Sequence, residues 1–196
     1  MEILLAIGRA SGLALAAGLN LYATLLALGL ASRFDLIQLP AAYEPLGSNT
    51  ALAAFVVLYL IEFLADKIPW LDTAWDLIHT IVRPLGGALL AIMAMGPSPP
   101  EVDVAAAVLG VALAGTSHLT KSSTRVVANA TLIPGLGLAL SLAEDAIAFV
   151  LSALVVFVPL VALFVAAVLF AVFVWLLLMM RRRMKKRRSA IRPGVE

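Results

Sequence analysis

Ionisable side chains inside otherwise apolar segments are the residues of this chain that could do chemistry. The segment TSHLTKSSTR, residues 116–125, carries His118, Lys121 and Arg125, which fall on one face of a helix. Only the 12 residues before it are apolar, and they would span roughly 18 Å of a hydrocarbon core that is about 30 Å thick. A membrane crossing must therefore include part of this polar segment. Because a charge near the bilayer centre costs about 3 kcal/mol, these side chains should have partners.

The carboxylates that could pair with these side chains lie in two other apolar segments. Glu62 and Asp66 are four residues apart and share a helical face, and Glu144 and Asp145 are adjacent in a later segment. Ionisable groups within a membrane mark the pathway of an ion, a proton or a substrate by default. We therefore expect such a pathway to be lined by Glu62, Asp66, His118, Lys121, Arg125, Glu144 and Asp145. The alternative is a structural network of ion pairs that locks the helices together.

Asn20 is the one amide in a stripe of small residues along the first apolar segment, in which Ala16, Thr24 and Ala27 lie on the same helical face. Small residues let helices approach closely, and an amide can hydrogen-bond across the contact. The stripe is therefore typical of a packing face. Because Asn20 lies at mid-depth, we also count it among the candidate pathway residues.

The segment PWLDTAWDLIHTIVR, residues 69–83, is amphipathic. Asp72, Asp76 and His79 lie along one helical face, with Trp70 and Leu77 on the other. Amphipathic segments with tryptophans usually lie flat at the membrane interface, and we expect this arrangement over about residues 69–82. Two carboxylates and an imidazole are also competent cation ligands, so Asp72, Asp76 and His79 could instead form a cytoplasmic gate or a divalent-cation site.

The composition places these residues in a membrane protein. Of 196 residues, 63% are hydrophobic and 13% are charged, whereas soluble domains average about half and a quarter. Soluble enzymes and nucleic-acid-binding proteins are thereby excluded as first interpretations. The absence of cysteine excludes disulfides, thiolate metal sites and cysteine nucleophiles. No spacing is specific for catalysis or for a cofactor, so we name no catalytic residue, expect no cofactor, and leave the identity of any bound metal open.

The apolar runs predict an all-α polytopic protein with about six transmembrane helices. The first four helices are expected at residues 3–31, 51–65, 84–96 and 103–130. The uncharged run 146–180 is too long for one crossing and is divided at Val158-Pro159. Residues 17–33 resemble residues 114–130, and LYLIE at 58–62 matches LSLAE at 140–144. We therefore expect two three-helix repeats, residues 1–96 and 97–180, which an odd number of crossings would make inverted.

Residues 181–196, RRRMKKRRSAIRPGVE, form a basic tail that holds eight of the fourteen lysines and arginines. Such flanks stay cytoplasmic, so we expect a bacterial inner-membrane protein with a cytoplasmic tail. Six crossings would also put the N-terminus in the cytoplasm, with Lys67 and Arg83 on that side. Beside a membrane the tail should bind anionic lipid head groups. We expect no nucleic-acid partner, and an oligomer is left open.

Four segments of the chain are similar to the landmarks of a bacterial integral-membrane family called domain of unknown function DUF4126. They are GLNLYATLLALGLASRF, EFLADKIPWLDTAWDLIHTIVRPLGGALLA, TSHLTKSSTRVVANA and SLAEDAIAF. The resemblance covers roughly residues 9–180. It implies a multi-pass membrane protein and assigns no activity.

Three functions fit these patterns. The first is a small secondary transporter or channel for an ion or small charged solute, which passes through the buried ionisable residues. The second is a structural or partner-binding membrane protein with an internal ion-pair network. The third is a membrane enzyme that acts on a lipid phosphate, gripped by the run from Lys121 to Arg125, with Glu62 or Asp66 as general base. We favour the first because intramembrane ionisable residues usually serve a pathway.

Overall fold

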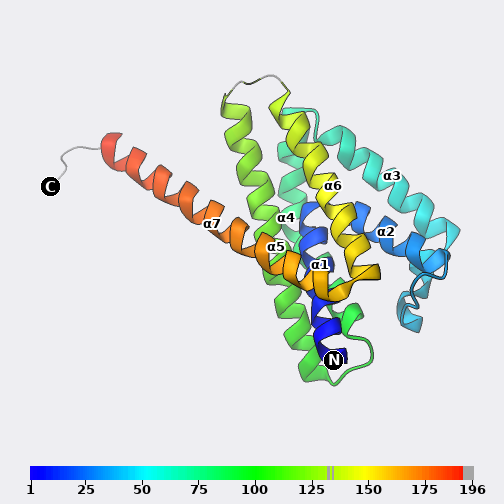
Figure 1. Cartoon of the computed structure of the whole chain (residues 1–196). Coiled ribbons are helices and arrows are strands. Elements are labelled where there is room, and N and C mark those ends of the chain that lie inside the picture. The colour runs from blue at the N-terminus through cyan, green and yellow to red at the C-terminus, as the bar shows by residue number, and fades with distance from the viewer. Residues whose placement is uncertain (132, 134, 192–196) are drawn as a thin grey trace.

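The chain folds into helices joined by short connections throughout the part that the computed structural model describes, residues 1–131, 133 and 135–191 (Figure 1). The elements are α1 (Glu2–Leu19), α2 (Leu21–Arg33), the 3-10 helix η1 (Ala41–Gly47), α3 (Asn49–Ala65), α4 (Pro69–Met95), α5 (Pro100–Thr131), α6 (Leu136–Phe157) and α7 (Pro159–Ile191). Within this part, five helices are long and apolar enough to cross a membrane, or six if the bent pair η1 and α3 forms one span. The predicted class, an all-α polytopic membrane protein, is confirmed.

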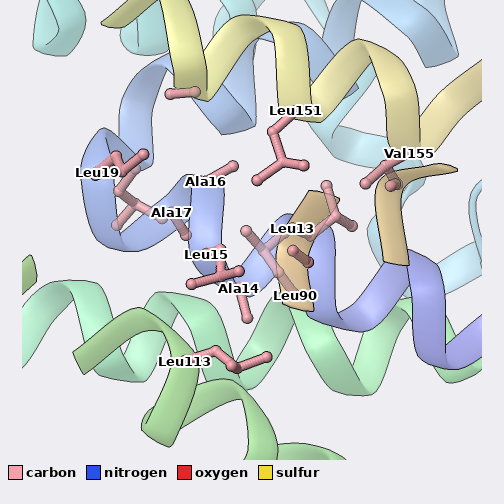
Figure 2. Close-up of a cluster of buried hydrophobic side chains, with 14 of the residues drawn as sticks. Leu13, Ala14, Leu15, Ala16, Ala17, Leu19, Leu90, Leu113, Leu151 and Val155 are labelled. Atoms are coloured by element: carbon pink, nitrogen blue, oxygen red, sulfur yellow. The ribbon is translucent and has the colours of Figure 1, made fainter. Parts of the chain in front are cut away.

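Helix α1 lies at the centre of the bundle, between α4 and α5 on one side and α6 on the other (Figure 2). Leu13 and Leu15 belong to one buried apolar cluster with Leu90 of α4, Leu113 of α5 and Leu151 of α6. Ala10, Ala14, Ala16 and Ala17 of α1 are fully buried between these neighbours. Small residues at this helix let the surrounding helices approach closely, in keeping with the packing role predicted for them.

The first predicted helix, residues 3–31, is broken into α1 and α2, and the prediction of one helix is wrong. Asn20 between them has an extended backbone with φ −150° and ψ 104°. Its side-chain oxygen accepts a hydrogen bond of 2.9 Å from the backbone N–H of Ala23 and so caps the start of α2. Asparagine is among the best residues for this capping position. The break depends on a single polar residue in a continuous apolar run, so hydrophobic periodicity did not reveal it.

Two cavities mark opposite ends of the bundle, separated by the length of α4. At the α4–α5 end lies a cavity of about 850 Å³. Its lining includes the first turns of α1, Leu28 of α2, the stretch 36–41, the end of α4 with the α4–α5 connection, and the last turn of α6. At the α5–α6 end, a cavity of about 360 Å³ is lined by Asp66 and Lys67 after α3 and by Ile133 and Gly135 between α5 and α6. Helices α4, α5 and α6 therefore run the full distance between the ends, and η1 together with α3 leads from the α4–α5 end to the α5–α6 end.

We call α1 and α2 the re-entrant pair, because residues 36–41, which follow α2, line the same cavity as the first turns of α1. Leu28 of α2 lines the same cavity as Leu13 of α1. One residue later, a Cβ atom on Gly29 would lie 2.5 Å from the backbone oxygen of Leu46 in η1. The chain thus enters from the α4–α5 end, turns at Asn20 inside the bundle and returns to the end from which it came.

Helix α4 is continuous over the segment for which we predicted an interfacial stretch and then a separate helix from Pro84. It runs for 27 residues and passes through Pro84 without a break. Its polar face, with Asp72, Asp76 and His79, is buried in the bundle. The helical period of a polar face is the same whether that face meets head groups or buried partners, so the pattern alone could not distinguish the two.

The uncharged run 146–180 divides as predicted, because α6 ends at Phe157 and α7 begins at Pro159. Helix α7 starts beside α1 and runs out past α5 (Figure 1). Large apolar side chains such as Val104, Phe164 and Trp175 are exposed on the outer faces of the long helices, as expected where helices contact lipid. The predicted basic tail, residues 181–196, begins within α7, and its last residues, 192–196, lie outside the described part.

The close crossing of α1 and α5 at Gly18 should be intolerant of any side chain. A Cβ atom on Gly18 would lie 2.2 Å from the backbone oxygen of Ala114, whereas a Cβ atom on Gly115 would meet only the ring of Pro84 at 3.9 Å. Gly18→Ala should therefore lower the free energy of unfolding by about 1–3 kcal/mol, the usual cost of overpacking. Denaturant unfolding in detergent micelles, with Gly115→Ala as the matched control, measures this. Equal effects of the two substitutions would contradict the crossing.

Candidate functional site

Ionisable side chains from four helices are buried together beside the break at Asn20. We call this set the charge cluster, and each member is at most 9% exposed. Its members are Glu62 and Asp66 at the end of α3, Asp72, Asp76, His79 and Arg83 on α4, His118, Lys121 and Arg125 on α5, and Glu144 and Asp145 on α6. The residues predicted for a pathway and those predicted for a separate gate thus lie in one cluster, and Asn20 contacts it through Asp145.

The end of α1 is held by donors from α4 and α5. A helix end leaves backbone carbonyls without partners. Here the oxygen of Gly18 accepts a hydrogen bond of 3.2 Å from Arg83, and the oxygen of Leu19 accepts one of 3.1 Å from Lys121. The hydroxyl of Ser117 donates to the oxygen of Leu15 at 3.0 Å. Cationic groups at a helix C-terminus also interact favourably with the helix dipole.

Glu62 is the carboxylate that compensates these two cations, and its side chain is fully buried. Its Oε1 atom accepts a hydrogen bond from Nη2 of Arg83 and lies 3.4 Å from Nζ of Lys121. Glu62 therefore joins α3 to α4 and α5. Arg83 was missed as a site residue, because its charge was interpreted as a mark of the cytoplasmic side. Its position on the same helical face as Asp72, Asp76 and His79 was the signal that could have found it.

Arg125 forms the second centre of the charge cluster and joins α5 to three other segments. Its Nη2 atom lies 2.6 Å from Oδ2 of Asp66 and 2.8 Å from Oε2 of Glu144, and its Nη1 atom donates to Asp72. The planar guanidinium suits such multiple pairing with carboxylates. Burial would raise the pKa of Asp66, but the charges of Lys121 and Arg125 outweigh burial and hold that pKa below its ordinary value.

The hydrogen bonds of the two histidines determine which ring nitrogens carry protons. Nη1 of Arg83 lies 2.9 Å from Nδ1 of His118. Arginine has only donors, so Nδ1 of His118 must be an unprotonated acceptor and the ring is neutral. Its Nε2–H then donates to the hydroxyl of Thr80 at 3.1 Å. His118 therefore does not act as a cation in the charge cluster.

His79 is held away from the carboxylates of its own helix. Its Nδ1 atom lies 2.8 Å from the backbone oxygen of Trp75, and its Nε2 atom lies 3.2 Å from the hydroxyl of Tyr22. Asp72 is paired with Arg125. In the described part of the chain, no three histidine or carboxylate side chains are grouped so as to hold a metal ion, and the geometry gives no support to a divalent-cation site at these residues.

Asp145 contacts the break between α1 and α2. Its Oδ1 atom accepts a hydrogen bond of 2.8 Å from Nδ2 of Asn20, and its Oδ2 atom lies 3.5 Å from the hydroxyl of Tyr59 on α3. One helical turn earlier on α6, the hydroxyl of Ser141 donates to Oδ2 of Asp66 at 3.3 Å. Tyr59 lies on the same helical face as Glu62, and Ser141 lies on the same face as Asp145. Their spacing in the sequence could therefore have identified both as site residues.

The cavity at the α5–α6 end gives access to the charge cluster. Asp66, Asp72 and Arg125 line it together with Lys67, which is exposed. The amine of Lys67 donates to the backbone oxygen of Phe63 and lies over that residue's ring. A charged solute that enters this cavity therefore meets both carboxylates and a guanidinium.

The residues proposed to grip a lipid phosphate do not form such a site. The hydroxyl of Ser122 donates to the backbone oxygen of His118 at 3.1 Å, and that of Thr124 donates to the backbone oxygen of Lys121 at 2.8 Å. Both bonds remain within α5. The nitrogens of Lys121 and Arg125 are occupied by carboxylates and by a backbone oxygen, so the geometry gives no argument for an enzyme acting on phosphate.

The substitution Glu62→Gln should destabilise the protein strongly. It removes the one carboxylate that pairs with Arg83 in the described part of the chain, and one of three that lie near Lys121, while both cations remain buried. Breaking a buried ion pair in this way costs about 3–5 kcal/mol. Denaturant unfolding in micelles measures the loss. Glu101→Gln, at an exposed position near the start of α5, is the control and should cost no more than about 1 kcal/mol. A loss at residue 62 as small as that of the control would contradict the assigned pairing.

Comparison of the sequence with models of protein families gives one match. The model covers residues 7–179, and the family is described as a domain of unknown function. Comparison with curated proteins and with solved structures found no match.

Proposed function

The chain belongs to this family, DUF4126, and on that premise we propose that the protein is a small secondary transporter or channel. It carries an ion or a small charged solute across the membrane, and the charge cluster is the pathway. The family resemblance expected from the sequence is confirmed, and it assigns no activity. The proposal therefore stands on the geometry of the site.

The observation that carries the proposal is the opening at the α5–α6 end. Asp66, Asp72 and Arg125 are members of the charge cluster and also line a cavity of about 360 Å³. A network that only locked helices together needs no opening to the surface. An ionisable cluster reached from the surface is instead what a pathway for a charged species requires.

The re-entrant pair supports the same conclusion from the other end. The cavity of about 850 Å³ at the α4–α5 end extends to Leu13 and Leu28, on the two arms of the pair. The tip at Asn20 thus lies between two cavities that approach from opposite ends. Discontinuous helices whose ends meet substrate or coupling ions are common in secondary transporters, where gating exposes the site to each side in turn.

The helix directions support two inverted halves. Helix α3 runs from the α4–α5 end to the α5–α6 end and α4 returns, whereas α6 runs from the α5–α6 end to the α4–α5 end and α7 starts from there. The pair α3–α4 is therefore opposite in direction to α6–α7. Helices α1 and α2 together span residues 2–33 and α5 spans residues 100–131, which are equal lengths. The folding back of α2 is the main difference between the halves.

We place the α5–α6 end in the cytoplasm of a bacterium, with the protein in its inner membrane. Lys67 lies at this end, and α7 leads from the opposite end toward the basic tail, which the positive-inside rule keeps cytoplasmic. The tail would contact anionic lipid head groups there. The re-entrant pair contributes no crossing, so five crossings remain and the N-terminus lies outside. This differs from the cytoplasmic N-terminus predicted from six crossings.

Glu144→Gln should reduce flux while the fold is kept. The side chain of Glu144 is 10% exposed and its Oε2 atom lies 2.8 Å from Arg125. Losing a hydrogen bond between charged groups, worth about 1.5–3 kcal/mol, should lower flux roughly tenfold or more. The measurement is current and tracer uptake in proteoliposomes after concentration steps of sodium, magnesium, phosphate and glutamate, with Glu101→Gln as the control.

The structural alternative makes a different prediction for the same experiment. If the charge cluster only holds the helices together, wild-type proteoliposomes will show no flux of these probes above protein-free vesicles. Glu144→Gln would then lower the unfolding free energy without any change in flux. That pair of results would contradict the proposed transport function.

A further inference from the structure

Asp145 is held in one position by the break between α1 and α2. The oxygen of the Asn20 side chain is occupied by the N–H of Ala23, so the amide NH₂ group must face Asp145. The bond from Nδ2 of Asn20 to Oδ1 of Asp145 is 2.8 Å long, and the carboxyl group is 5% exposed. Asp145 is therefore a buried acid fixed against the tip of the re-entrant pair.

Asp145 forms no ion pair with a lysine or arginine among the described residues. Glu62, Asp66, Asp72 and Glu144 each lie within 4.0 Å of a lysine or arginine nitrogen, whereas in the described part of the chain Asp145 and Asp76 do not. The ionisable groups that face Asp145 are Tyr59 and Glu62 of α3, Asp66 and Lys67 after α3, and Lys121 of α5, with both lysine nitrogens more than 4.0 Å from its carboxyl group. Its own helix adds Glu144 beside it in the sequence.

The charge cluster as a whole has more acids than bases. It contains six carboxyl groups and three cations, Arg83, Lys121 and Arg125. His118 is neutral, and even a charged His79 would leave an excess of acid. An uncompensated carboxylate in the interior is costly, and the usual resolution is that the group binds a proton.

Two features favour the opposite, ionised form of the same group. Helix α2 begins immediately after Asn20, and the N-terminus of a helix favours a nearby negative charge. The hydrogen bond donated by Asn20 is also stronger when its acceptor is ionised. Burial without a counter-charge thus favours the protonated form, and the local donors favour the ionised form. A group under such opposed influences can both take up and release a proton.

We propose that Asp145 is a proton-binding site at the tip of the re-entrant pair and that protons are the coupling ion of the transporter. The coupling rests on the proposed function, whereas the proton site stands on the geometry above. The proton reaches Asp145 from the cavity at the α5–α6 end, because Ser141, one turn away on α6, contacts Asp66 at the cavity wall. Binding converts the carboxylate to a carboxylic acid and weakens its bond to Asn20, which loosens the contact that holds the tip.

Asp76 is the competing candidate for a buried proton. Its Oδ1 atom is buried and has no hydrogen-bond partner among the described residues, and none of their lysine or arginine nitrogens lies within 4.0 Å of its carboxyl group. It contacts neither Asn20 nor the break, so a proton there would not act on the re-entrant pair. The same substitution, aspartate to asparagine, can be made at both positions and separates the two.

Infrared difference spectroscopy of the purified full-length protein during a pH titration tests the proton site directly. In the wild type we expect the band of a protonated carboxyl group, which shifts on hydrogen–deuterium exchange and is lost as the pH rises. The difference spectrum of Asp145→Asn should lack this band. The band should persist in Asp76→Asn and in Glu101→Gln, and it should shift in Asp145→Glu. Persistence of the full titrating signal in a folded Asp145→Asn variant, or its disappearance in Asp76→Asn alone, would overturn the proposal.

Proton flux separates this proposal from the proposed function. Proteoliposomes are loaded with a pH-sensitive dye and given a concentration step of whichever of the solutes named above shows flux. Protons should then move in the wild type, and this proton movement should be lost in Asp145→Asn. If the infrared band depends on Asp145 but no vesicle shows flux, the proton site holds and the transport function fails. If solute flux occurs without proton movement, transport holds and proton coupling is overturned.

Discussion

The end of α1 inside the bundle is the constraint on which the rest of the structure depends. A helix that stops among apolar neighbours leaves backbone carbonyls that neither lipid nor hydrocarbon side chains can satisfy. The last turn of α1 obtains its partners from Ser117, Lys121 and Arg83. The polar second half of α5 and the buried arginine of α4 are therefore required by the break, and Asn20 starts the next helix on its other side.

The buried cations in turn determine where the carboxylates lie. Lys121 and Arg83 share Glu62, and Arg125 draws together acids from α3, α4 and α6. This pairing joins every long helix that runs between the two ends. The pairing is incomplete, since among the described residues Asp76 and Asp145 have no cation within 4.0 Å, and it is open to a cavity at one end. A network that served packing alone would need neither feature, and both suit the passage of a charged species.

Much of the site could be predicted from the sequence, because charge inside an apolar segment is costly and therefore informative. Lys121 and Arg125 had to meet carboxylates such as Glu62 and Glu144 somewhere in the bundle, and they do, whereas His118 contacts Arg83 and Thr80 instead. The break at Asn20 was not predictable from periodicity, since the flanking residues are equally apolar in one helix or two. The role of Arg83 and the continuity of α4 were missed for a related reason: a polar helical face has the same spacing whether water or buried partners cover it. Tertiary contacts determine both the role of Arg83 and the continuity of α4.

Single-cysteine labelling tests the central claim, that α1 and α2 enter the membrane and return on the same side. The chain has no cysteine, so variants with Cys at Glu2, Gln38 or Ile133, all exposed, carry no background. In oriented membrane vesicles, a membrane-impermeant maleimide should label positions 2 and 38 from the same side and position 133 from the other. Labelling of positions 2 and 38 from opposite sides would show that α1 and α2 cross the membrane together, and would contradict the account.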